Sequence, residues 1–149
     1  MKISEVNEDN IEIVMKINQY DGWAAKVAEQ HPNLIIKILK FCRPGERPSV
    51  LKVIPLEKIL EVVKAEPDSS YFFVTKFPGE TVEIIKTLVE KSGVINETAL
   101  RIHFNFIIPK LPDHITLEVI KAFPERISWI LELKPKLTDE VEKIFKLED

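Results

Sequence analysis

Cysteine is nearly absent from this 149-residue chain, which carries only Cys42. A single thiol excludes an internal disulfide framework and a zinc site built from several cysteines. Cys42 ends an apolar stretch, and we interpret it as a small hydrophobic side chain packed in a core. The alternative is a nucleophile whose pKa is lowered by Arg43 and Arg47.

Histidine and glycine are scarce as well. The three histidines lack a metal-binding spacing such as HExxH, and we interpret them as surface or capping residues: His31, His103 and His114. The four glycines form neither GxGxxG nor GxxxxGK[ST], which disfavours a phosphate loop and a dinucleotide-binding turn. We therefore expect no metal, no cofactor and no catalytic residue, and a non-enzymatic protein. A small hydrolase or transferase with a site invisible in the sequence is a minor alternative.

Long apolar segments are missing too. The longest stretch without Asp, Glu, Lys or Arg is the eight residues 102–109, whereas a membrane span needs about 20 apolar residues. The opening residues MKISE contain no apolar segment of the kind found in secretory signals. These features predict a soluble, intracellular protein of the cytoplasm that does not bind membranes.

Neither sign of charge dominates, because 21 Lys and Arg face 24 Asp and Glu, for a net charge of −3. Binding to nucleic acid depends mainly on neutralising phosphates, so this balance disfavours a nucleic-acid partner. A helical repeat that binds nucleic acid is kept as the alternative function. It would use a stripe of basic residues: Arg43, Arg47, Lys52, Arg101, Lys110 and Arg126.

What the chain does contain is regularly spaced proline. Eight of its ten prolines form a regular series: Pro32, Pro44, Pro55, Pro67, Pro78, Pro112, Pro124 and Pro135. Neighbouring members are 11 or 12 residues apart, except that the gap between Pro78 and Pro112 has the length of three such steps. Proline is accepted in the first turn of a helix and strongly disfavoured in its interior. The spacing therefore limits each helix to about ten residues, and helices this short must pack on neighbours to be stable.

An internal duplication supports this interpretation. Residues 54–91 fall without a gap on residues 111–148, an offset of 57 that equals five proline steps, and 11 of the 38 pairs are identical. We therefore predict helices at these ranges: 8–18, 22–30, 33–42, 47–53, 56–65, 68–76, 80–91, 97–107, 113–122, 125–133 and 138–147. Asn7 and Asn96 are expected N-caps, and Gly93 an expected C-cap.

The unit of two short helices, with proline near each helix start, resembles the leucine-rich repeat variant solenoids. The motif Pro112-x-x-x-Thr116-x-x-x-Ile120 and the following Pro124 carry the resemblance, and Pro55-x-x-x-Ile59-x-x-x-Val63 repeats it. The chain lacks the cysteine run that some of these proteins use for an iron–sulfur cluster. The resemblance implies an α-superhelix without intrinsic enzyme chemistry.

The predicted fold is therefore all-α, a single-domain α-solenoid of about ten short helices that covers residues 1–149. Residues 1–31 form N-terminal cap helices, residues 32–91 and 112–149 form the repeat segments, and residues 92–111 form an irregular connection. The expected core is a set of apolar side chains at repeating positions: Ile36, Leu39, Leu60, Val63, Phe72, Phe73, Ile84, Leu88, Leu100, Phe104, Leu117, Ile120, Trp129, Ile130, Val141 and Phe145.

Positions where one repeat is aromatic and the other polar suggest a binding surface. Tyr71 aligns with Ser128, Phe123 with Glu66 and Phe77 with Lys134, so we expect the three aromatic side chains to face solvent; covering a local end or groove is an equally weighted alternative. A solenoid presents one broad face, and aromatic and arginine side chains dominate binding energy at interfaces. The candidate partner-binding residues are Arg43, Arg47, Tyr71, Phe77, Arg101, His103 and Phe123. We expect a protein partner, and a role as an adaptor or as a regulator or inhibitor of a larger assembly.

Overall fold

The computed structural model describes residues 2–17, 21–92 and 96–146. Its regular elements are α-helices and short 3-10 helices, with no strand among the described residues, which confirms the all-α prediction. Residues 70–75 and 103–108, whose composition is typical of strands, are helical or lie in a 3-10 turn. No helix of the described ranges is both long enough and apolar enough to cross a membrane. The chain divides into two compact units, Met1–Ala65 and Glu66–Asp149.

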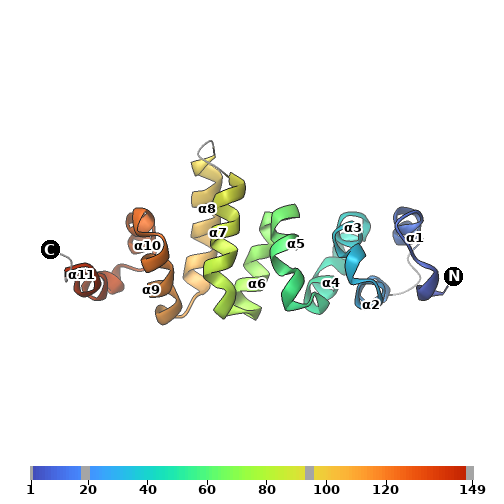
Figure 1. The fold of residues 1–149 in the computed structure, drawn as a ribbon, viewed down its shortest axis with the longest axis horizontal. Coiled ribbons are helices and arrows are strands. Elements are labelled where there is room, and N and C mark those ends of the chain that lie inside the picture. Colours follow the sequence, from blue (N-terminus) through green and yellow to red (C-terminus); the bar gives the residue numbers. More distant parts are fainter. Residues whose placement is uncertain (1, 18–20, 93–95, 147–149) are drawn as a thin grey trace. The chain divides into compact units, whose positions relative to one another are not determined.

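The first unit consists of five α-helices and four 3-10 turns within the described residues. They are η1 (Ile3–Glu5), α1 (Ile11–Lys16), α2 (Trp23–Gln30), η2 (Pro32–Leu34), α3 (Ile35–Phe41), η3 (Pro44–Glu46), α4 (Arg47–Val53), η4 (Leu56–Lys58) and α5 (Ile59–Ala65). Helices pack on the next helix and on the next but one, since α3 contacts α1, α2, α4 and α5, and α2 contacts α4. Figure 1 shows α2, α3 and α4 gathered in this way.

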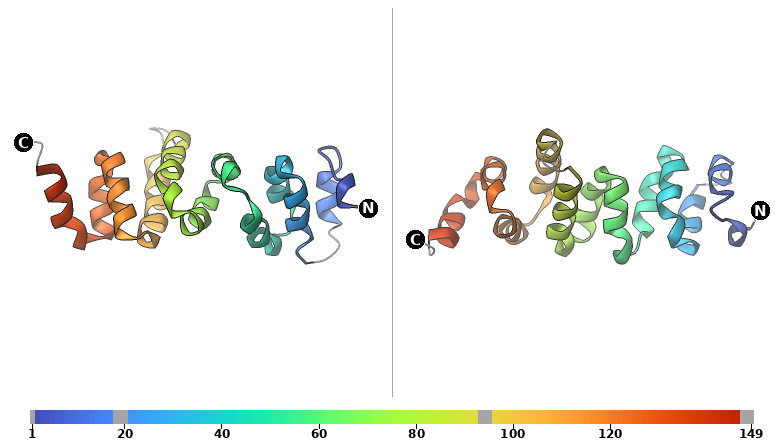
Figure 2. Two further views of the ribbon diagram at one scale, coloured as in Figure 1. Left: turned by 60° about the horizontal axis from the view of Figure 1, so that its bottom comes forward. Right: turned by 45° about the horizontal axis from the view of Figure 1, so that its top comes forward.

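The second unit follows the same scheme with longer central helices. Its described elements are η5 (Pro67–Ser69), α6 (Ser70–Lys76), η6 (Pro78–Glu80), α7 (Thr81–Ser92), α8 (Glu97–Ile107), η7 (Ile108–Lys110), α9 (Asp113–Ala122), η8 (Pro124–Arg126), α10 (Ile127–Leu133), η9 (Pro135–Leu137) and α11 (Thr138–Lys146). Helix α8 packs on α6, α7 and α10, and α9 packs on α7 and α10. The α7–α8 pair and the orange α9–α10 pair lie side by side in both views of Figure 2.

Several helix junctions share one backbone conformation at the residue before a proline. His31, Phe77, Phe123 and Lys134 have φ between −128° and −136° and ψ between 65° and 68°. Their N–H groups donate to the carbonyl four residues back, and their carbonyls accept from the residue three ahead. The α conformation is disfavoured before proline, so the helix ends there and a 3-10 turn begins at the proline.

The same junctions recur at the offset of 57 residues. Pro67–Ser69 corresponds to Pro124–Arg126, and Pro78–Glu80 corresponds to Pro135–Leu137, with identical element bounds after the shift. Hydroxyl side chains also coincide, because Thr81 and Thr138 each donate to the carbonyl of the proline three residues earlier at 2.7 Å. The duplication in the sequence is therefore repeated in the local structure of these two junctions.

The predicted caps have different outcomes. Asn96 accepts a hydrogen bond from the Ala99 N–H at 3.3 Å, as an N-cap should. Asn7 instead caps the turn before α1, where its Oδ1 accepts from the N–H groups of Asp9 and Asn10. Gly93 lies outside the described residues.

Ten of the sixteen predicted core residues are buried, and six are only half-buried: Ile36, Leu60, Phe72, Leu117, Trp129 and Phe145. Phe72 and Trp129 are equivalent in the two repeats, and each ring is covered by a cation instead of by apolar neighbours alone. Lys76 lies 5.9 Å from the Phe72 ring, and Arg126 lies 4.4 Å from the Trp129 ring. The amphipathic stems of such cations shield an aromatic face that a short helix cannot bury.

The expectation that three aromatic residues face solvent is wrong for Phe123, which is buried. Its premise also fails at Lys134, the counterpart of Phe77, because Lys134 is buried as well. The Lys134 Nζ donates to the carbonyl of Leu111 at 2.5 Å and to the Thr116 hydroxyl at 2.8 Å. A lysine can therefore occupy an interior position of the repeat when its ammonium finds acceptors there.

Candidate functional site

Helix α8 exposes apolar side chains on the side opposite its buried ones. Leu100, Phe104 and Ile107 are buried at helical spacing, whereas Ile102 is 49% exposed and Phe106 is 54% exposed. Positions 102 and 106 are four residues apart and therefore share one face of the helix. Large exposed apolar side chains beside aromatic rings are typical of interaction surfaces.

Helix α6 completes this surface. The Tyr71 ring stacks on the Phe106 ring with centroids 5.1 Å apart, and the Tyr71 hydroxyl lies 2.7 Å from Nδ1 of His103. The Nζ of Lys110, at the end of η7, lies 5.5 Å from the Tyr71 centroid. We call the set of Tyr71, Ile102, His103, Phe106 and Lys110 the α6–α8 face.

Burial favours the neutral forms of the tyrosine and the histidine of this face, through the pKa of each. Burial raises the pKa of Tyr71, and the negative charge of Asp68 raises it further. Burial lowers the pKa of His103, and Asp68 opposes this effect. We assign the phenol O–H as the donor to Nδ1, which leaves the imidazole proton on Nε2.

The face thus offers apolar surface together with hydrogen-bond donors. Ile102, Phe106 and the Tyr71 ring supply the apolar part, and His103 Nε2–H and the Lys110 ammonium supply the donors. This combination suits binding of a side chain or backbone acceptor next to an apolar group.

Two of the predicted site residues, Tyr71 and His103, are brought together in this way. Arg101 lies on α8 near the face, where it pairs with Glu132 and lies 5.5 Å from the Trp129 ring. Phe77 is half-buried at the junction before Pro78, under the Nζ of Lys76. Phe123 is interior and does not contribute to a surface.

Arg43 and Arg47 belong to the first unit. Arg47 is half-buried and donates from Nη1 to the Leu39 carbonyl at 3.0 Å, so it binds the C-terminal end of α3. Arg43 is exposed and lines a pocket of about 460 Å³. The other lining residues are Asp21, Gly22, Gly45, Glu46 and Ser49.

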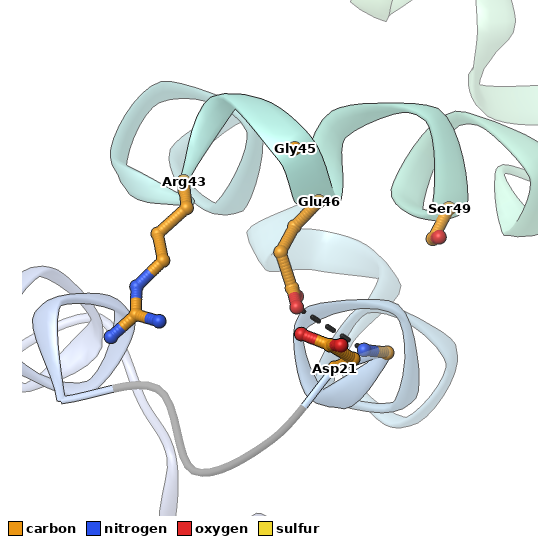
Figure 3. A pocket seen from close by; sticks show the side chains of 6 residues that line it. Asp21, Arg43, Gly45, Glu46 and Ser49 are labelled. Atoms are coloured by element: carbon orange, nitrogen blue, oxygen red, sulfur yellow. Dashed lines mark hydrogen bonds between the residues drawn. The ribbon is translucent and has the colours of Figure 1, made fainter.

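The carboxylate in this pocket has a structural task. Glu46 reaches from η3 to the start of α2, with Arg43 and Ser49 on either side of it in Figure 3. Its two oxygens accept from the N–H groups of Gly22 and Ala24, each at 3.2 Å. Gly22 has a φ of 84°, a conformation that favours glycine. Glu46 therefore caps α2 from another element.

The sequence does not single out Ile102, Phe106, Lys110 or Asp68 as site residues, although Lys110 belongs to the stripe of basic residues considered for nucleic-acid binding. A signal was present, because the apolar residues from 100 to 108 occupy both sides of the predicted helix. The core can cover only one side of this helix, so apolar residues on the second side indicate a contact with something other than the core.

Among the described residues, no group of three or more His, Cys, Asp or Glu side chains is placed to hold a metal ion. A scan of protein-family models found no match to the chain, and searches of the curated proteins and of the solved structures found none either.

Proposed function

We propose that this chain is a non-enzymatic protein-binding module whose partner docks on the α6–α8 face. The observation that carries this proposal is the exposure of Phe106 and Ile102 on the side of α8 away from its buried residues. Phe106 is more than half exposed even though it stacks on Tyr71. Aromatic residues of this kind most often dominate the binding energy of protein interfaces.

The module acts in this proposal as an adaptor, or as a regulator or inhibitor of a larger assembly, inside the cell. The short helices with prolines at their starts support the resemblance to leucine-rich repeat variant solenoids, which bind partners along one face. Arg43 and Arg47 are secondary candidates for contact with a partner, since Arg43 is exposed and lines the pocket of the first unit.

Affinity purification from the native host, with mass spectrometry and nuclease treatment, tests the proposal. Three baits are compared: the wild type, Phe106→Asp and the control Leu56→Asp, because Leu56 is 48% exposed in the other unit. Circular dichroism first establishes that both variants fold. We expect proteins that the wild type and Leu56→Asp retain and Phe106→Asp loses.

Two results would contradict this proposal. The same proteins retained by all three baits would place binding away from the α6–α8 face. Proteins retained only without nuclease would favour the alternative function, a helical repeat that binds nucleic acid.

A further inference from the structure

Among the described residues, Lys110 is a cation of the α6–α8 face without a carboxylate partner. Arg101 and Arg126 in the same unit are paired with Glu132 and Glu97, and Lys134 and Lys136 are both paired with Asp113. The Nζ of Lys110 lies over the Tyr71 ring, and no carboxylate of the described residues pairs with it. Its ammonium is therefore available to a carboxylate that comes from outside.

The other polar groups of the face restrict where such a carboxylate can bind. The pair of Tyr71 and His103 presents the Nε2–H donor, but the negative charge of Asp68 acts on both residues. A second negative charge beside His103 would be repelled by Asp68. The favourable position for an acidic group is consequently beside Lys110.

The apolar part of the face lies next to this cation along the chain. Ile102, Phe106 and Lys110 follow one another at steps of four residues along the chain. The Phe106 ring, the middle one of the three, stacks on the Tyr71 ring. Apolar side chains and an unpaired ammonium are thus presented together, and this charge pattern selects the partner.

From this arrangement we propose that the α6–α8 face binds a peptide segment of the partner protein that carries an apolar side chain followed or preceded closely by Asp or Glu. The apolar side chain packs on Ile102 and Phe106, and the carboxylate pairs with Lys110. This inference rests on the proposed function and specifies the chemistry of its partner.

A single-stranded nucleic acid also offers negative charge and stacking surfaces. The negative charge of Asp68 acts on Tyr71 and His103 of the face, and residues 66–149 carry 15 acidic against 11 basic side chains, which disfavours a polyanion. Nucleic acid is therefore an outcome of the test and not the proposal.

Selection from a phage-displayed library of random 12-residue peptides against the full chain provides the probes. The strongest peptide is synthesised with a fluorescent label, together with a matched version in which each Asp or Glu is replaced by its amide. Fluorescence anisotropy then measures the affinity of both peptides for the wild type, Phe106→Ala, Lys110→Glu and the control Lys121→Glu. Lys121 is an exposed lysine on α9, outside the face.

We expect the selected peptides to combine apolar and acidic residues. Replacing the acidic residues by amides, or Lys110 by Glu, weakens binding about tenfold, because a favourable charge pair is lost or reversed. Phe106→Ala weakens it more than about tenfold, as hot-spot truncations do, and Lys121→Glu changes it less than about twofold.

The possible failures are distinct. If Phe106→Ala weakens binding but neither the amide peptide nor Lys110→Glu does, the acidic requirement is wrong and the protein-binding face stands. If no selected peptide responds to Phe106→Ala, both the inference and the location of the proposed function are wrong. Displacement of the peptide by a 12-nucleotide oligo(dT) would instead assign the face to nucleic acid.

Discussion

The buried ammonium of Lys134 gives the sharpest test of how the repeats are held together. The substitution Lys134→Met retains the apolar stem of the side chain and removes the three hydrogen bonds of Nζ. These bonds go to Leu111 O at 2.5 Å, Thr116 Oγ1 at 2.8 Å and Asp113 Oδ1 at 3.5 Å. Thr116 keeps its bond to the Pro112 carbonyl, so the buried carbonyl of Leu111 is the group left without a donor.

An unsatisfied buried acceptor costs about 1–3 kcal/mol, and we therefore expect Lys134→Met to lower the free energy of unfolding by about 2 kcal/mol. For a chain of this size such a change lowers the melting temperature by roughly 4–8 °C. Urea denaturation followed by circular dichroism measures the free energy directly, and the m-value shows whether both proteins unfold from states of equal compactness.

Lys136→Met is the matched control. Lys136 also pairs with Asp113, at 3.3 Å, but its side chain is 70% exposed. Exposed ion pairs contribute about 0–1 kcal/mol, so this variant should remain within about 0.5 kcal/mol of the wild type. If both variants lose equally little free energy of unfolding, the interior role of Lys134 is refuted, and its side chain faces solvent.

Three further predictions concern single side chains. An NMR titration should place the pKa of His103 below the usual value of about 6.5, and Asp68→Asn should lower this pKa further. The free energy of unfolding should then decrease as the pH falls from about 6.5 toward the lowered pKa, because the unfolded chain takes up the proton first. Phe123→Ala should lower the free energy of unfolding by about 3–5 kcal/mol in chemical denaturation, because the ring is buried. A decrease below about 1 kcal/mol would show that the ring is exposed instead. Glu46→Gln should lower the free energy of unfolding by about 1 kcal/mol, since the amide keeps only one acceptor for the Gly22 and Ala24 N–H groups, and an unchanged melting temperature would contradict this capping role.

The positions of the helices could be predicted from the sequence because proline restricts both itself and the residue before it. Ten of the eleven predicted ranges contain one α-helix of the described residues completely, and α7 ends one residue beyond the predicted range 80–91. The predicted starts at 33, 56, 68 and 125 are two or three residues early, since the first turn after the junction is a 3-10 turn there. Sequence composition does not distinguish the two kinds of turn.

Burial was harder to predict than secondary structure. The comparison of the two repeats treated a polar residue as evidence of exposure, and Lys134 shows that a polar residue can be interior when backbone carbonyls accept from it. Such acceptors come from a segment more than 20 residues away, at Leu111, and only the tertiary structure brings them together.

The candidate site was predicted in part. Tyr71 departs from its polar counterpart in the other repeat, and His103 is among the predicted partner-binding residues, but their hydrogen bond joins α6 to α8 across 32 residues. Phe106 was missed because an apolar residue in a short helix is usually assigned to the core. Its exposed position becomes evident only once Phe104 and Ile107 are seen to fill the buried side.

Amide hydrogen exchange of the full chain, alone and with a captured partner, shows whether the partner docks on the α6–α8 face. We predict slower exchange on binding in residues 68–76 and 97–110, which carry the α6–α8 face, and unchanged exchange in residues 43–49 around the pocket of the first unit. Protection confined to residues 43–49, or to any segment outside 68–76 and 97–110, would place the binding site away from the α6–α8 face.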